Sequence, residues 1–250
     1  MLDFLALQLQ GDDQWSLKKT VRRMVLSQTY QLSSAYNAKG AADDPDNRWL
    51  WQMPRRRLGA ESIREAMLMV SGELNPGRGG PSLGLELNDN IRGAGGNVNP
   101  ATWGGHIADE IKQRRSVYLP LQRQRPMGDF EILSTFDFPH PSEIVGARPN
   151  TTVATQALFL INAPFVKHQA VKLAERLVKE EPDDRLRINR LYLLTASRPA
   201  ESDEIESALT FLDHCTQDLT AAAGNEKARL SAWAELCHAV LGSNNFLFLE

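Results

Sequence analysis

Glycine is concentrated in one part of this chain and limits what that part can fold into. Residues 72–105 hold ten of the seventeen glycines, and no helical period of apolar residues survives there. Segments without secondary structure that exceed about 12–15 residues are uncommon in compact domains and are usually functional or disordered. We therefore expect the chain to divide into a helical first zone up to residue 71, an irregular middle zone of residues 72–150, and a third zone of residues 151–250.

The first zone has the pattern of short amphipathic helices. Apolar side chains recur at a 3.6-residue period near its start, and a helix that begins near Ala60 has Gly72 as its predicted stop. The turn-rich stretch "NAKGAADDPDN" is expected to interrupt these helices. The apolar positions that define the periods are Leu2, Leu5, Leu9, Leu17, Val21, Met24, Val25, Ile63, Met67 and Val70.

The third zone is expected to be a run of helices. The stretch "TTVATQALFLINAPFVKHQAVKLAERLVKE" has two helical patterns divided near Pro164, because proline lacks the donor for a helical hydrogen bond. Further helices are expected in "RLRINRLYLLTAS" and "DEIESALTFLDHCTQDL", and the last, "KARLSAWAELCHAVLG", has Gly242 as its C-cap. The ending "FLFLE" is too apolar for a free tail, so we expect Phe246 and Phe248 to be mostly buried.

The middle zone offers little regular structure. Val117 to Leu121 form a short run with extended character, and a proline-rich path follows it. The expected fold class is therefore mainly α, with helical N-terminal and C-terminal zones joined by a long Gly- and Pro-rich middle that has at most a small β pairing. We expect residues 1–250 to form a single domain made of these three parts.

Composition argues against several classes of protein. The formal net charge of −3 argues against a general nucleic-acid binder, which would show a basic excess. No apolar run approaches the ~20 residues that a membrane span needs. The N-terminus lacks the basic and apolar regions of a signal peptide. It begins as though within a helix, which suggests a fragment of a longer protein.

Cysteine and histidine do not form a recognisable metal or haem site. The pairs His214-Cys215 and Cys237-His238 occupy adjacent helical positions, which point about 100° apart, whereas two zinc ligands on one helix need a spacing of three or four. The stretch "AELCH" lacks the first cysteine of the haem-attachment motif C-x-x-C-H. The sequence therefore predicts no metal and no cofactor. Free thiols are favoured for the two cysteines over a single disulfide.

No catalytic motif stands out. The chain has no G-x-S-x-G and no H-E-x-x-H, and "RGAGGNVN" lacks both the phosphate-binding loop motif and a complete G-x-G-x-x-G. Acids of the middle zone could form a carboxylate pair, but sequence gives no distance between them. Whether the chain is an enzyme is therefore left open. The acids concerned are Asp89, Asp109, Glu110, Asp129 and Asp137.

Arginine is the most informative residue type. Arg55, Arg56 and Arg57 directly precede a predicted helix, where the helix dipole disfavours cations, and residues 112–127 hold five cations and no acid. Guanidinium groups pair with carboxylates inside a fold or with anions outside it, and we favour the internal role. Asp137 is the expected partner of Arg56 and Arg57, because it sits between two phenylalanines and needs a cation if it is buried. The candidate ion-pair or anion-binding network is Arg56, Arg57, Arg114, Arg115 and Asp137.

Six stretches, in order, resemble a known family. They are "DDPDNRWLWQMPRRRLGAESIREAMLMVSGELNPGRGGPS", "RRSVYLPL", "TFDFPHPS", "TTVATQALFLINAPFVKHQAVKLAERL", "RLYLLTASRPAESDEIESALTFL" and "LCHAVLGSNNFLFL". Together they resemble the planctomycete domain of unknown function numbered 1553, from Leu2 to Glu250. The resemblance implies the C-terminal part of a large periplasmic or cell-surface protein, with a signal peptide, often a cytochrome c-like domain, and a second uncharacterised domain upstream. It implies no catalytic residues, because the family has no assigned reaction.

Two functions are compatible with these features. The first is a non-catalytic helical interaction module that docks onto upstream domains of the same or a parent protein, or onto another extracytoplasmic partner. The second is a carbohydrate- or anion-binding or hydrolytic domain whose site lies in the middle zone, where arginines, acids, Trp103 and Tyr118 gather and a glycan could bind. Neither involves nucleic acid or a membrane span.

Overall fold

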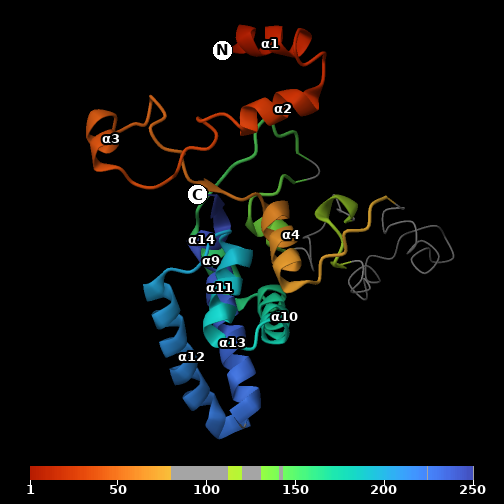
Figure 1. Cartoon of the computed structure of the whole chain (residues 1–250). Helices are drawn as coiled ribbons and strands as arrows, with labels where there is room; N and C mark the ends of the chain where they lie inside the picture. Colours follow the sequence, from red (N-terminus) through yellow and green to blue (C-terminus); the bar gives the residue numbers. More distant parts are fainter. Residues whose placement is uncertain (80–111, 120–130, 141–142, 224, 250) are drawn as a thin grey trace, which may run out of the picture. The chain divides into compact units, whose positions relative to one another are not determined.

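The computed structural model describes residues 1–79, 112–119, 131–140, 143–223 and 225–249. Within these ranges it contains eleven α-helices, one short 3-10 helix and two strands of two residues, so the predicted mainly α fold is confirmed (Figure 1). The chain divides into two units, Met1–Arg56 with Phe248–Glu250 and Arg57–Leu247. The single domain expected for residues 1–250 stays a prediction. None of the helices in the described ranges is long and apolar enough to cross a bilayer.

The first unit begins with two helices that fold back on each other, α1 (Leu2–Gln10) and α2 (Leu17–Val25), as Figure 1 shows. The carboxylate of Asp13, in the turn between them, is buried. It accepts hydrogen bonds from Arg23 at 2.7 Å and from Thr20 at 3.0 Å. These bonds outweigh the desolvation of Asp13 and lower its pKa. A buried carboxylate with two donors on α2 thus fixes the turn of this α1–α2 hairpin.

A third helix in this unit corrects one expectation. The stretch "NAKGAADDPDN" contains α3 (Ala38–Asp43) and is not only a turn. The side chain of Asn37 accepts hydrogen bonds from the backbone N–H groups of Lys39 and Gly40, which caps the helix start. The ring of Trp51 packs so closely on Gly40 that a Cβ there would lie 2.5 Å from it. Six residues are too few to show a helical period, so the cap and this contact decide the conformation.

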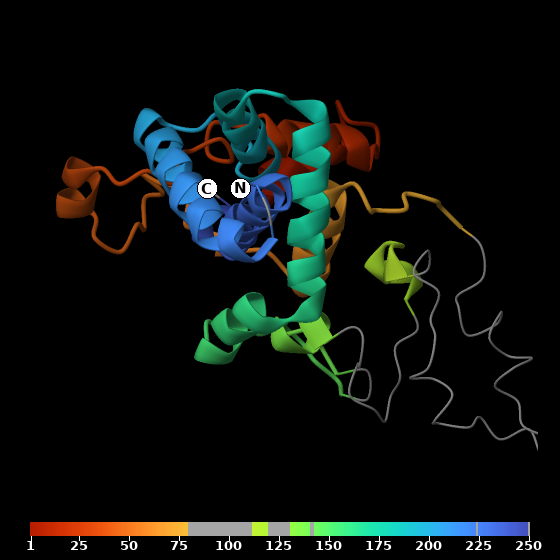
Figure 2. The same ribbon diagram turned by 90° about the horizontal axis from the view of Figure 1, so that it is seen from below.

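The core of the second unit lies between five helices, α4 (Ala60–Ser71), α10 (Pro164–Glu180), α11 (Asp184–Thr195), α12 (Ser202–Ala223) and α13 (Asn225–Leu241). Helix α13 lies between α10 and α12, and α4 packs on the other side of α10 (Figures 1 and 2). Residues three or four apart on each helix share a face, and these faces meet to form the core. Its largest fully buried apolar side chains include Ile63, Met67, Leu173, Leu177, Ile188, Leu191, Leu212, Trp233 and Leu241.

Shorter helices complete this unit. They are α8 (Glu131–Thr135), α9 (Ala154–Asn162), α14 (Asn244–Leu247) and the 3-10 helix η1 (Ser116–Tyr118). Pro164 is the first residue of α10, where its missing N–H costs nothing, so the predicted division between α9 and α10 is confirmed. The extended run expected from Val117 is wrong for its described part, because η1 covers Ser116 to Tyr118.

The only strands in the described ranges are β1 (Arg56–Arg57) and β2 (Phe248–Leu249), which pair with each other. The small β pairing expected in the middle zone is therefore found elsewhere, and the described part of that zone has a single isolated bridge, between Asn75 and Arg114. Phe246 is buried, as predicted, whereas Phe248 is only partly buried. The apolar ending of the chain is therefore ordered, with a short helix before its strand.

Two glycines that follow helices give a matched test. Gly72 ends α4 with φ at +85°, in the left-handed region, whereas Gly242, after α13, has no positive φ. We predict that Gly72→Ala lowers the free energy of unfolding by about 1 kcal/mol, because a Cβ is disfavoured in that region. Gly242→Ala, with no neighbouring atom closer than 3.6 Å, should be neutral or slightly stabilising. Urea denaturation measures both, and equal effects would contradict the backbone argument.

Candidate functional site

Arg57 is the centre of the first polar cluster, and its side chain is only 4% exposed. One terminal nitrogen donates to Asp137 Oδ2 at 2.6 Å, and Nε donates to Asn150 Oδ1 at 3.0 Å. The guanidinium carbon lies 5.2 Å from the centre of the Phe136 ring. The guanidinium is therefore held by a carboxylate, an amide and an aromatic face that all come from outside its own strand, β1.

Asp137 is held from the other side as well. Its φ of +64° is unusual for a residue with a side chain, and it follows directly after Phe136, next to α8. Thr151 donates its backbone N–H to Oδ2 and its hydroxyl to Oδ1, each at 2.8 Å. Gln156, at the start of α9, donates in turn to the Thr151 hydroxyl at 3.3 Å. The Arg57–Asp137 pair thus joins the segments before α4, after α8 and before α9.

The five residues of the candidate network do not form one site. Arg57 and Asp137 are brought together, and Arg56, which was expected to share that carboxylate, does not reach it. Arg56 is exposed, and its side chain has no hydrogen bond or ion pair within the described ranges. Arg114 and Arg115 belong to a different cluster, around α4.

That second cluster is built around Arg64, which is 2% exposed on the buried face of α4. It donates to the backbone oxygen of Arg114 at 2.9 Å, to Ser116 Oγ at 3.3 Å, and to the backbone oxygen of Lys112. Burial lowers the pKa of Arg64 to about 10, so the group is still cationic at neutral pH. Its position three residues before Met67 and four before Leu68, both buried on α4, is the sequence signal that could have identified it.

Glu65, the next residue on α4, also binds the segment that contains Arg114 and Ser116. It accepts hydrogen bonds from Ser116 N–H and from Arg115 Nε, each at 2.9 Å. Desolvation raises the pKa of Glu65, but these two donors outweigh it and the pKa is lowered. Arg114 stacks on Tyr118, with 4.2 Å from guanidinium carbon to ring centre. Residues 112–118 are therefore fastened to α4 by one buried cation and one carboxylate.

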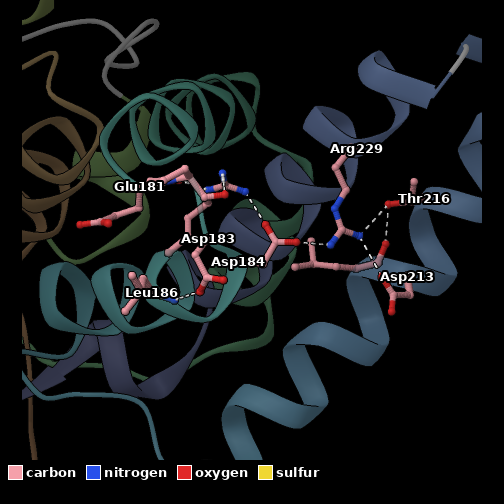
Figure 3. Close-up of polar contacts among 10 residues, drawn as sticks. Glu181, Asp183, Asp184, Leu186, Asp213, Thr216 and Arg229 are labelled. Carbon is pink, nitrogen blue, oxygen red and sulfur yellow. Dashed lines mark hydrogen bonds and ion pairs between the residues drawn. The ribbon is translucent and has the colours of Figure 1, made fainter.

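A third cluster, which sequence reasoning missed, joins α11, α12 and α13 (Figure 3). One oxygen of Asp184 accepts from Arg187 at 2.5 Å, and the other accepts from Arg229. Arg229 also donates to Asp213 at 3.1 Å and to Thr216 at 3.2 Å, both on α12. The Asp184–Arg187 pair has the local spacing i, i+3. The partners of Arg229 lie 13 to 45 residues from it on two other helices, so no local spacing predicts them.

Arg187 is buried within this cluster. It donates to the backbone oxygens of Glu181 and Pro182, and its guanidinium carbon lies 4.9 Å from the ring centre of Trp233 on α13. Trp233 is fully buried, and its indole N–H has no hydrogen-bond partner within the described part of the chain. An unpaired buried N–H group costs free energy, and the cation–π contact between Arg187 and the Trp233 ring offsets part of that cost.

The contacts of these three clusters are those of ion pairs and hydrogen bonds that stabilise the fold. In each cluster the carboxylates face cations or N–H donors. The described residues include no group of three or more His, Cys, Asp or Glu side chains placed to hold a metal ion. Cys215 and Cys237 are free, as favoured from the sequence, and burial raises the pKa of the Cys237 thiol far above its usual range. Cys237 is therefore an unreactive core residue.

The fold and its clusters define a mainly helical protein in which arginines tie irregular segments to helices. A family model described as "Protein of unknown function (DUF1553)", named PSD1, matches residues 1–212. The chain belongs to this family, which confirms the resemblance seen in the sequence over these residues. No curated protein and no solved structure matches the chain.

Adjacent arginines allow a direct test of the first cluster. We predict that Arg57→Ala lowers the free energy of unfolding by about 3 kcal/mol, because it leaves the part-buried Asp137 without its cation. The loss lies at the low end of the usual range since Thr151 still donates to that carboxylate. Arg56→Ala, which removes an exposed side chain, should change stability by less than about 0.5 kcal/mol. Equal denaturation midpoints for the two variants would contradict the assignment.

The second cluster predicts a pH dependence. The folded-state pKa of Glu65 is lowered, so its ionised form stabilises the fold at neutral pH, and this contribution is lost as pH falls from about 4.3 toward the folded-state value. Glu65→Gln should therefore lower the melting temperature at pH 7, and its difference from the wild type should shrink through that acid window. Glu143→Gln, an exposed acid with no ion pair within the described ranges, is the control. A difference independent of pH would be inconsistent with this role.

Proposed function

We propose that this chain is a non-catalytic helical interaction module of a larger extracytoplasmic bacterial protein of planctomycete origin. In this proposal it docks onto upstream domains of the same or a parent protein. Membership of a family of unknown function is compatible with it but assigns no partner. The support comes from the second unit, where charged side chains are paired within the fold and apolar side chains are exposed on one helix.

The observation that carries the proposal is the outer face of α9. The inner side of this helix is anchored, because Leu160 is buried, its carbonyl accepts a 2.8 Å hydrogen bond from His238, and Phe159 packs edge-on against Phe136. The outer side carries Leu158 and Ile161, which are 57% and 59% exposed.

The composition of α9 makes this face unusual. The helix has no charged residue, in a chain that is 24% charged. Its exposed apolar positions follow the spacing i, i+3, i+4 and i+7, so they form one stripe. A contiguous apolar stripe on a fixed helix is typical of a surface that another protein covers. The residues of this α9 stripe are Ala154, Ala157, Leu158 and Ile161.

The alternative, a carbohydrate- or anion-binding or hydrolytic site in residues 72–150, has less support. Arg115 pairs with Glu65, and Arg114 stacks on Tyr118, so these arginines already have partners within the fold. Several other residues of that hypothesis lie outside the described ranges, namely Asp89, Trp103, Asp109, Glu110 and Asp129.

Calorimetric titration of the chain with a separately produced upstream segment of the parent protein tests the proposal. The wild type should bind, and Leu158→Ser with Ile161→Ser should weaken binding more than tenfold, because each buried side chain contributes about 1.5 kcal/mol or more. Val171→Ser with Val178→Ser, a similarly exposed apolar pair on α10, should leave the affinity unchanged. Absence of binding by the wild type would refute the docking function, whereas unchanged affinity in the α9 variant would refute this face alone.

A further inference from the structure

Helix α2 in the first unit carries a second exposed apolar stripe, with a different chemistry. Leu17 and Val21 are 71% and 53% exposed, and Met24 and Val25 are 43% and 40% exposed. Their spacing of four, three and one residues places all four side chains on one side of the helix. Ser16 accepts a hydrogen bond from Lys19 N–H and caps this helix. The stripe is thus held on a defined element and is not part of a loose tail.

The rest of α2 is entirely cationic apart from Thr20. Lys18, Lys19, Arg22 and Arg23 occupy the other side of the helix, and the whole stretch from residue 14 to residue 42 contains five cations and no acid. Because the complete chain has a net charge of −3, the remainder is net acidic, and this stretch is one of two strongly cationic ones, the other being residues 112–127. Arg23 is paired with Asp13, while the side chains of Lys18 and Arg22 have no partner within the described residues.

Exposed aromatic and apolar residues surround the same helix. Trp15 directly precedes its cap, and Tyr30 follows its end by one turn, both more than half exposed. On α1, Phe4 and Leu7 are exposed as well. Tryptophan and tyrosine favour the boundary between the apolar and polar layers of a membrane, where an apolar ring and a polar tip are both accommodated.

We propose that the α1–α2 hairpin binds the surface of an anionic lipid membrane. Helix α2 would lie in the interface plane, with its apolar stripe among the acyl chains near the headgroups and its cations at the lipid phosphates. The Asp13–Arg23 pair fixes α2 to the turn that precedes it and leaves Lys18 and Arg22 for the membrane. This inference is independent of the docking function proposed for α9.

The charge around the stripe favours a lipid surface over a protein partner. Four of the nine residues of α2 are cations, whereas α9, a helix of the same length, carries no charged residue. A lipid surface needs no shape complementarity, and each cation near an anionic membrane contributes about 1 kcal/mol. The remainder of the chain has a net negative charge and would as a whole be repelled by such a membrane, so the attraction depends on the charge around α2.

Vesicle co-sedimentation of the full chain tests the proposal. The wild type should bind phosphatidylcholine vesicles that contain 30% phosphatidylglycerol, in 0.1 M salt, and bind pure phosphatidylcholine vesicles much more weakly. Lys18→Gln with Arg22→Gln should reduce the partition coefficient about 30-fold, as two lost cations imply. Raising the salt to 0.5 M should weaken wild-type binding by screening the same attraction.

Matched variants separate the stripe from general surface effects. Val21→Ser with Val25→Ser should also lose vesicle binding, while Lys167→Gln with Lys179→Gln on α10 and Leu158→Ser with Ile161→Ser on α9 should keep it. Circular dichroism establishes that each variant retains its helices. Equal binding to both vesicle types, or equal loss in the α10 variant, would overturn the proposal. Absence of wild-type binding to the anionic vesicles would also overturn it. If sedimentation velocity then showed a dimer that the Val21 and Val25 changes dissociate, a second copy of the chain would be what covers the stripe.

Discussion

The buried guanidinium groups of the second unit are stable only because oxygen atoms in fixed positions accept hydrogen bonds from their N–H groups. Arg57, Arg64 and Arg187 are each less than 10% exposed, and each is bound by acceptors from a segment outside regular helix. Moving a cation out of water costs several kcal/mol, and that cost is offset only by well-placed partners. The requirement therefore acts in both directions: the acceptors permit the burial, and the buried cation fixes the conformation of the segments that supply them. Those segments include residues 112–115 and 181–183.

This use of arginine bears on function. Guanidinium groups that hold the fold together are not free to bind a substrate, so the arginine-rich composition of the chain is not by itself a sign of an anion site. The two units instead leave apolar side chains exposed to solvent, on α9 and on α2. Exposed apolar stripes on fixed helices are features of association, and a family without an assigned reaction is consistent with a module of this kind.

Local patterns explain why much of the fold could be predicted from sequence and much of the site could not. The long helices show an apolar period that is read directly from neighbouring residues, whereas α3 depends on a cap from Asn37 and on the ring of Trp51. Asp137 was identifiable because it lies between two phenylalanines, and a half-buried acid needs a cation. The pairing of Asp184 with Arg229 brings together two helices that are remote in sequence, and sequence spacing contains no information about that distance.

The two stripes differ in a way that makes their roles separable. The α9 stripe lies on a helix without charge, so the free energy of covering it comes from apolar burial and depends little on ionic strength. The α2 stripe is bordered by cations, so whatever covers it is attracted by a field that salt screens over about 10 Å at 0.1 M. Apolar area alone would therefore give both helices similar partners, and it is on the charge around each stripe that we base the proposal of a protein surface for α9 and of an anionic membrane for α2.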